Sequence, residues 1–156
     1  MASNDLTTVL EAEGVAYELL PHSHTESALA EAEALGLEPT DVAKTLVVET
    51  PDGYVRAVIP ASERLDLRKL GDFLGAGKKQ IHLASEEALA RDYPEFDLGA
   101  VPPLGGSRRD PIVIDRRVAE RDLVVLEAGS HDESVRIAPA ALVRLPGAQV
   151  ADLSAD

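Results

Sequence analysis

A proline- and glycine-rich stretch, DLGAVPPLGG at 97–106, contains no hydroxyl, imidazole, thiol or amine, and Asp97 is its one ionisable group. Pro102 and Pro103 fix their own φ angles and donate no hydrogen bonds. The useful N–H groups therefore belong to the other residues from Gly99 to Gly106, and glycine lets a substrate approach the backbone closely. The stretch suits main-chain binding of a carbonyl group, and it equally suits a rigid surface turn.

Lys44 is the second candidate, because it is the only basic residue before Arg56 and begins the aliphatic run KTLVVET. A lysine is a flexible point charge that suits a phosphate or a substrate carboxylate. At the end of a strand the same residue is ordinarily solvated, so its position alone leaves both interpretations open.

Other familiar motifs fail on spacing or composition. In GDFLGAGKK five residues separate Gly71 from Gly77, and Lys79 stands where a phosphate-binding loop needs Ser or Thr. The chain has no cysteine, which excludes disulfides, thiolate metal sites and cysteine nucleophiles. His22 and His24 lack further ligands at recognisable spacing and are interpreted as surface histidines. We expect no metal and no cofactor.

The composition predicts one domain over residues 1–156 with an aliphatic core, since 45% of residues are hydrophobic but only 3% aromatic. The formal charge of −13 disfavours a nucleic-acid partner, although residues 61–117 are balanced with ten acids and ten bases. A basic face that includes Lys69, Arg116 and Arg117, or a solvated surface of mixed charge, fits this pattern.

The N-terminal residues, MASNDLTTVLEAEG, are too polar and acidic for a signal peptide. No apolar run approaches the roughly 18 residues that span a bilayer. We therefore expect a cytoplasmic protein with no membrane partner.

Strands and helices alternate irregularly along the chain, which predicts an α+β fold with a mixed sheet. Helices are expected at 4–13, 25–36, 66–74, 85–92 and 139–145, with Thr25, Asp66 and Ser85 as N-caps. Strands are expected at 15–20, 44–50, 54–60, 80–84, 111–115, 122–128, 134–137 and 148–153. Residues 51–53, Pro-Asp-Gly, indicate a hairpin between the second and third of these strands.

Five segments in order, DVAKTLVVET, YVRAVIPASERLDLRKL, LGAVPPLGG, IVIDRRV and EAGSHDESVRI, resemble the YbaK/EbsC-type superfamily. This superfamily contains the editing domains of prolyl-tRNA synthetases and free-standing aminoacyl-tRNA deacylases. The resemblance runs from about residue 11 to residue 145. Two signatures carry it, Lys44 at the head of its strand and a G-x-x-x-P loop at 99–103.

The resemblance implies a curved, partly barrel-like mixed sheet flanked by helices, and hydrolysis of a mischarged tRNA in trans. Lys44 would hold a phosphate near the terminal adenosine, and Gly99 and Pro103 would frame the loop that positions carbonyl and water. Ala100, Val101 and Pro102 would contact the substrate, and His131 would line the amino-acid pocket, as a histidine does in the alanine-editing members. A tRNA hydroxyl would assist the water, so no protein nucleophile is needed.

The expected substrate is tRNA(Pro) carrying a small amino acid such as Ala or Cys, and prolyl-tRNA synthetase is a further possible partner. Pro102 removes an N–H that other family members can use, so the choice of amino acid stays open. Two alternatives also remain: a non-catalytic adaptor that binds tRNA or a synthetase, and a deacylase of small free aminoacyl esters.

Overall fold

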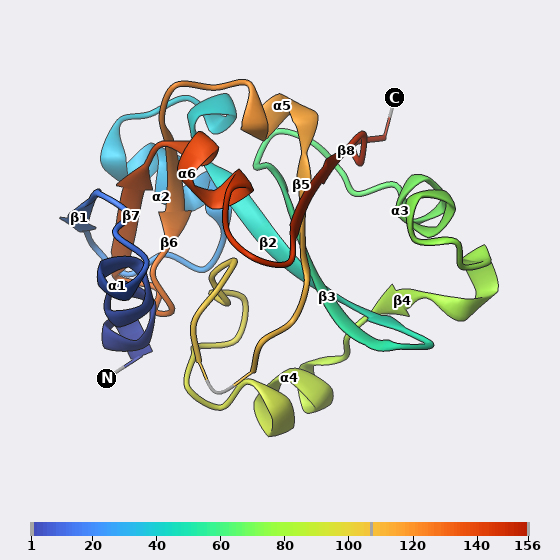
Figure 1. Cartoon of the computed structure of the whole chain (residues 1–156). Helices are drawn as coiled ribbons and strands as arrows, with labels where there is room; N and C mark the ends of the chain where they lie inside the picture. Colours follow the sequence, from blue (N-terminus) through green and yellow to red (C-terminus); the bar gives the residue numbers. More distant parts are fainter. Residues whose placement is uncertain (1, 107, 156) are drawn as a thin grey trace.

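A five-stranded sheet with strand order β4-β2-β3-β5-β8 forms the centre of the computed structural model, which describes residues 2–106 and 108–155 (Figure 1). Its strands are β2 (Ala43–Thr50), β3 (Gly53–Pro60), β4 (His82–Leu83), β5 (Ile112–Asp115) and β8 (Ala148–Ala151). β2 pairs antiparallel with β3 and β4, whereas β3, β5 and β8 run parallel. The expected hairpin at 51–53 and the expected mixed sheet are both confirmed.

A three-stranded antiparallel sheet with order β1-β7-β6 stands beside the first one. It contains β1 (Tyr17–Pro21), β7 (Glu133–Ile137) and β6 (Val124–Glu127). A parallel bridge between Val42 and Val125 joins β6 to the residue that precedes β2. The described strands thus form two linked sheets in an α+β fold, and this single bridge brings the C-terminal part of the chain against the head of β2.

Six helices surround the sheets: α1 (Ala2–Ala12), α2 (Ala28–Leu35), α3 (Leu67–Leu74), α4 (Glu86–Asp92), α5 (Arg116–Ala119) and α6 (Pro139–Val143). Two short 3₁₀ turns, η1 (Pro39–Asp41) and η2 (Lys78–Gln80), precede β2 and β4. None of the helices in the described part of the chain is long and apolar enough to cross a lipid bilayer.

Helix boundaries follow the capping residues. Asp66 accepts hydrogen bonds from the N–H groups of Arg68 and Lys69, and Ser85 accepts one from that of Ala88, so both expected N-caps are confirmed. The expectation for Thr25 was wrong, because Ser27 caps α2 instead. Thr25 is buried, and its N–H donates to the His131 carbonyl at 2.8 Å, which ties the segment before α2 to the turn after β6.

The central sheet is covered on both faces, as strand alternation in β3 requires. Val58 packs into a core with Ile114, Leu126 and Leu142 beneath α1 and α6. Ala57 and Ile59, one residue to either side, face a second core that contains Leu70 of α3.

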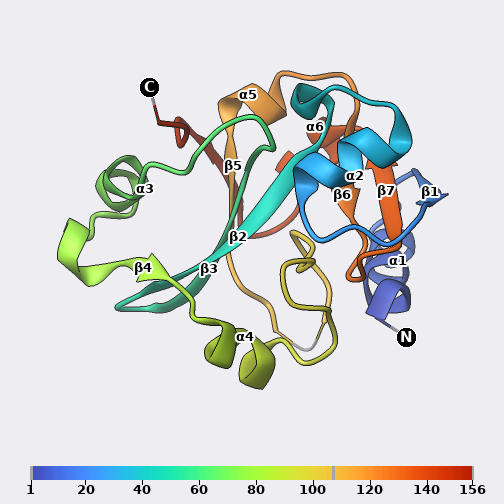
Figure 2. The ribbon, with the colours of Figure 1, turned by 180° about the vertical axis from the view of Figure 1, so that it is seen from behind.

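A third cluster packs α2 onto both sheets, with Ala32 against Val42 and Val125 (Figure 2). The helix therefore covers the place where the sheets join, and its N-terminus lies beside the head of β2.

Candidate functional site

The first half of the 97–106 loop is tied to the turn after β6. The Asp97 N–H donates to the Gly129 carbonyl at 2.9 Å, and the Asp97 carboxylate accepts the His131 N–H at 3.2 Å. The Ala100 N–H closes back onto the Asp97 carbonyl at 3.0 Å. These bonds hold residues 97–100 against the 129–131 turn, 30 or so positions away in the sequence.

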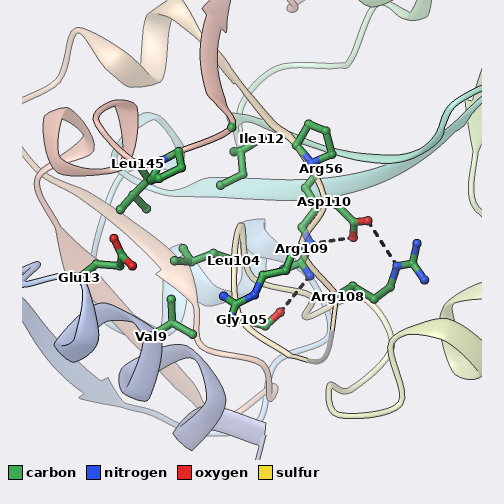
Figure 3. A pocket seen from close by; sticks show the side chains of 13 residues that line it. Val9, Glu13, Arg56, Leu104, Gly105, Arg108, Arg109, Asp110, Ile112 and Leu145 are labelled. Carbon is green, nitrogen blue, oxygen red and sulfur yellow. Dashed lines mark hydrogen bonds and ion pairs between the residues drawn. The ribbon is translucent and has the colours of Figure 1, made fainter.

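The second half of the loop is held by the buried guanidinium of Arg56, which is 1% exposed. Its Nη1 donates to the Pro102 carbonyl at 3.0 Å and its Nη2 to the Gly105 carbonyl at 2.9 Å. Figure 3 shows the Gly105 carbonyl and the Asp110 carboxylate converging on this side chain. A rigid two-pronged donor on β3 therefore sets the distance between two loop carbonyls.

The charge of Arg56 is balanced inside the protein. The Asp110 carboxylate lies 3.5 Å from Arg56 Nε and accepts a hydrogen bond from the Tyr93 hydroxyl. The guanidinium carbon lies 5.0 Å from the centre of the Tyr93 ring, within the range of a cation–π contact. Burial, followed by the bond to Asp110, raises the pKa of Tyr93 above its ordinary value, so this phenol stays a donor.

A cavity of about 290 Å³ opens between this loop, the head of β2 and the start of α2. It is lined by residues 43–47 of β2, by Ser27, Ala28, Leu83, Ala84 and Leu89, and by Gly99, Val101 and Glu127. Lys44 and two residues of the loop thus meet at one hollow, although more than 50 residues separate them in the sequence.

Lys44 is half-buried at the cavity wall. Burial lowers the pKa of its ammonium group, the nearby Arg64 acts in the same direction, and Glu63 opposes both. Its side chain forms no hydrogen bond or ion pair with any residue that the structure describes. The ammonium group is therefore available to an anion that enters the cavity.

Gly99 and Val101 line the same cavity and have main-chain donors without a partner. Their N–H groups meet no acceptor within the described part of the chain, whereas the N–H of Ala100 is already used. Gly99 has a φ of 83°, a value that favours glycine. A Cβ at this position would also lie 3.5 Å from the His131 ring.

The other loop residues singled out in the sequence lie behind the cavity wall. Ala100, Pro102 and Pro103 are buried and do not line the cavity. Pro102 contributes its carbonyl to Arg56. These three residues therefore belong to the buried side of the loop and do not form the cavity surface.

His131 is also buried behind the wall, 5% exposed. Its Nε2 lies 2.5 Å from the Leu98 carbonyl, which can only accept, so Nε2 carries a proton. Its Nδ1 has no hydrogen-bond partner among the described residues and faces the Glu127 carboxylate at 3.5 Å. His131 therefore connects Gly99 and the loop to Glu127.

Glu127 is a cavity residue that the sequence analysis missed. It ends β6 and is 8% exposed, and burial, followed by the negative charges of Glu31, Asp97 and Glu26, raises the pKa of its carboxyl group to about 9. The one available signal was an acidic residue at the end of the aliphatic run LVVLE. The sequence analysis also overlooked Arg56, a single charged residue within the aliphatic run YVRAVIP.

Glu31 on α2 is a second buried acid, fully inaccessible to solvent. Burial raises the pKa of its carboxyl group to about 7, although a hydrogen bond from Ser134 opposes the shift. His22 Nε2 lies 2.8 Å from the same Ser134 hydroxyl. No group of three acids or histidines within residues 2–106 and 108–155 is arranged to hold a metal ion.

A second cavity, of about 390 Å³, has walls from α1, the loop and the segment before β5, with Glu13, Arg56 and Arg109 among its polar side chains (Figure 3). It shares no lining residue with the cavity at Lys44. Because it lacks both Lys44 and the free N–H groups of Gly99 and Val101, we assign the candidate site to the smaller cavity.

Three basic residues of the middle region share one acidic partner. Lys69, Arg116 and Arg117 gather around the Asp152 carboxylate at 3.3, 3.8 and 3.3 Å. The expected basic face is therefore partly neutralised by an acid from the C-terminal segment.

Comparison with known proteins places this geometry in a family. The sequence profile of the aminoacyl-tRNA editing domain matches residues 22–145, which include Lys44, the loop and His131. The chain belongs to the aminoacyl-tRNA editing family. The expected enzyme class, a hydrolase of aminoacyl-tRNA esters, and the YbaK/EbsC resemblance are confirmed at this level.

Individual relatives agree with this assignment. The chain is 32% identical over 130 residues, 82% of its length and 77% of the relative's, to a candidate Cys-tRNA(Pro)/Cys-tRNA(Cys) deacylase, EbsC, of Enterococcus faecalis. The crystal structure of a candidate trans-editing enzyme for prolyl-tRNA synthetase matches with a TM-score of 0.84 at 28% identity, covering 99% of this chain and 98% of that one. A crystal structure of a protein described as hypothetical matches with a TM-score of 0.87 at 26% identity, covering 97% and 99%.

We predict that Arg56→Met lowers the free energy of unfolding of this editing domain by about 3 kcal/mol, because it leaves two loop carbonyls and Asp110 without their buried partner. Urea denaturation at pH 7 measures the loss. Arg136→Met is the matched control, since Arg136 pairs with Glu18 on the surface and should cost less than about 1 kcal/mol. Equal losses in both variants would contradict a role for Arg56 in holding the two loop carbonyls.

Burial of Glu31 predicts a pH-dependent stability. The folded state holds the Glu31 proton up to about pH 7, whereas the unfolded state releases it near 4.5. The contribution of this group therefore falls as the pH rises from about 4.5 to about 7. Glu31→Gln should raise the free energy of unfolding at pH 8 by up to about 3 kcal/mol, and the gain should vanish near pH 4. Urea denaturation at both pH values checks this, and a gain independent of pH would refute it.

Proposed function

We propose that this protein is a trans-acting deacylase that hydrolyses the ester of a small non-cognate amino acid, such as Ala or Cys, on tRNA(Pro). The observation that carries the proposal is the meeting of the unpartnered Lys44 ammonium and the free N–H groups of Gly99 and Val101 at one cavity. These are the two kinds of group that an aminoacyl ester at the end of a tRNA requires, a cation for phosphate and donors for the carbonyl oxygen.

An ester is already activated towards attack by water. Hydrogen bonds from main-chain N–H groups to the carbonyl oxygen can therefore catalyse its hydrolysis without a protein nucleophile. One donor aimed at the developing oxyanion is typically worth ~10²–10³-fold in rate. In the proposed mechanism Lys44 holds a phosphate near the terminal adenosine, and Gly99 and Val101 donate to the carbonyl oxygen as water attacks. Pro103, Pro102 and Ala100 keep the loop in the required shape.

The size of the cavity supports a small aminoacyl group. Its walls include Ala28, Ala43, Ala84 and Gly99, and its volume is about 290 Å³. His131, packed behind Gly99 and Glu127, buttresses this end of the pocket. The choice between Ala and Cys rests on the residues that back the pocket, and the resemblance of His131 to alanine-editing members favours Ala.

The names of the relatives support tRNA(Pro) as the partner. One relative is named for Cys-tRNA(Pro) and Cys-tRNA(Cys), and another for prolyl-tRNA synthetase. We propose mischarged tRNA(Pro) as the substrate, prolyl-tRNA synthetase as a further partner, and the cytoplasm as the place of action.

Removal of the Lys44 charge tests the proposal directly. Lys44→Ala should lower kcat/KM for a mischarged tRNA(Pro) by roughly 100-fold or more while circular dichroism and the urea midpoint stay unchanged, because a charge-assisted contact to phosphate is lost. Lys79→Ala, which removes an exposed lysine on a distant turn, should retain full activity. Full activity in Lys44→Ala would remove this residue from the mechanism.

A substrate panel separates the candidate functions. We expect rapid hydrolysis of Ala-tRNA(Pro) or Cys-tRNA(Pro), slower hydrolysis of Ser-tRNA(Pro), and sparing of Pro-tRNA(Pro). Uncharged tRNA should inhibit the hydrolysis by competing for the site, whereas it would not inhibit a deacylase of small free esters. If the protein binds tRNA but hydrolyses none of these substrates, the result would favour the alternative function, a non-catalytic adaptor.

A further inference from the structure

We infer that Glu127 is the receptor for the α-ammonium group of the substrate, so that the cavity selects aminoacyl esters over uncharged acyl esters. The inference rests on the proposed function and extends it from the ester to the amino group beside it. It assigns a role to a buried carboxylate that the proposed hydrolysis does not otherwise use.

Glu127 is built into the cavity with one carboxyl oxygen left without a protein partner. The side chain is 8% exposed and lines the hollow, and its Oε2 atom has no hydrogen-bond partner among the described residues. A buried, unpaired polar atom costs free energy unless a ligand satisfies it. His131 Nδ1 faces this oxygen at 3.5 Å and is also without a hydrogen-bond partner among the described residues.

The sheet junction places Glu127 and Lys44 on the walls of one cavity. Val42 and Val125 form a parallel bridge, and two residues further along each strand come Lys44 and Glu127. Because residues two apart along a strand point to the same face, both side chains turn towards the face covered by α2. Lys44, which can bind an anion, and Glu127, which can bind a cation, therefore both line this cavity.

The electrostatic surroundings of Glu127 favour a cation. Glu31 from α2, Asp97 from the loop and Glu26 from the segment before α2 all act on Glu127 with negative charge, and His131 is the imidazole that faces it. These carboxylates disfavour a negative charge on Glu127 in the empty site and, for the same reason, attract a positive charge placed next to it.

The covalent structure of an aminoacyl ester matches this arrangement. Its ammonium group is attached one carbon away from the carbonyl, on the side opposite the adenosine. With the carbonyl oxygen at the N–H groups of Gly99 and Val101, and the phosphate at Lys44, the ammonium group falls within the same small cavity, whose remaining charged wall residue is Glu127.

Two non-hydrolysable probes test the inference by binding alone. The first is 3′-amino-3′-deoxyadenosine 5′-phosphate acylated on its 3′-nitrogen with alanine, and the second carries lactate, which replaces the ammonium group with a hydroxyl. Calorimetry or fluorescence competition at pH 7 gives the ratio of their affinities. The wild type should prefer the alanyl probe by roughly 10–100-fold.

Glu127 gives up its proton when the ammonium group binds beside it, because a neighbouring positive charge favours the carboxylate. Glu127→Gln keeps the size of the side chain but cannot form that carboxylate, so the preference should fall to within about twofold of unity. Glu31→Gln is the matched control for the surrounding charges: it removes one of the three carboxylates that act on Glu127 without touching the cavity, so it should reduce the preference only in part. The ratio is measured within each variant, so a partial loss of folded protein cancels.

The outcomes are distinct. A wild-type preference that disappears in Glu127→Gln but persists in Glu31→Gln supports the inference. A wild type that binds both probes equally, or a Glu127→Gln variant that keeps the preference, overturns it and leaves the deacylase function standing. A wild type that binds neither probe overturns the proposed function together with the inference.

Discussion

Two hydrogen bonds from one buried guanidinium determine the shape of the candidate site. Arg56 spans the Pro102 and Gly105 carbonyls, and Asp110 and Tyr93 balance its charge. Proline removes donors from the loop and leaves carbonyls that need partners, and a planar guanidinium supplies two donors at a fixed spacing. The carbonyls are held by β3, and the N–H groups of Gly99 and Val101, two residues that line the cavity, have no acceptor among the described residues.

The site also depends on how two sheets meet. The bridge between Val42 and Val125 sets the register of β6 against the head of β2, and Ala32 of α2 seals the junction. The same contact brings Glu127 and Lys44 to one cavity, and the His131 ring lies behind Gly99. A shift of one residue in this register would turn Lys44 or Glu127 to the opposite face, so the apolar packing of the junction is as important to the site as its polar residues.

Two buried acids near the cavity carry a cost in stability. Glu31 and Glu127 have raised pKa values because burial disfavours their charged forms. Such groups are retained where function uses them, and this pattern of raised pKa values in a cleft is typical of functional sites. Arg56 differs from them, since its charge is paired and its role is to hold the backbone.

Local features of the chain were predictable from the sequence, because they depend on neighbouring residues. The hairpin at 51–53 and the N-caps Asp66 and Ser85 follow from short-range chemistry, and Lys44 and the 99–103 loop stood out by type and position. Thr25 was misassigned, and Arg56 and Glu127 were overlooked, since a charge within an aliphatic strand is ordinarily solvated. Only the tertiary structure buries Arg56 beneath the loop and Glu127 behind α2, because burial is decided by segments that are distant along the chain and pack over those positions.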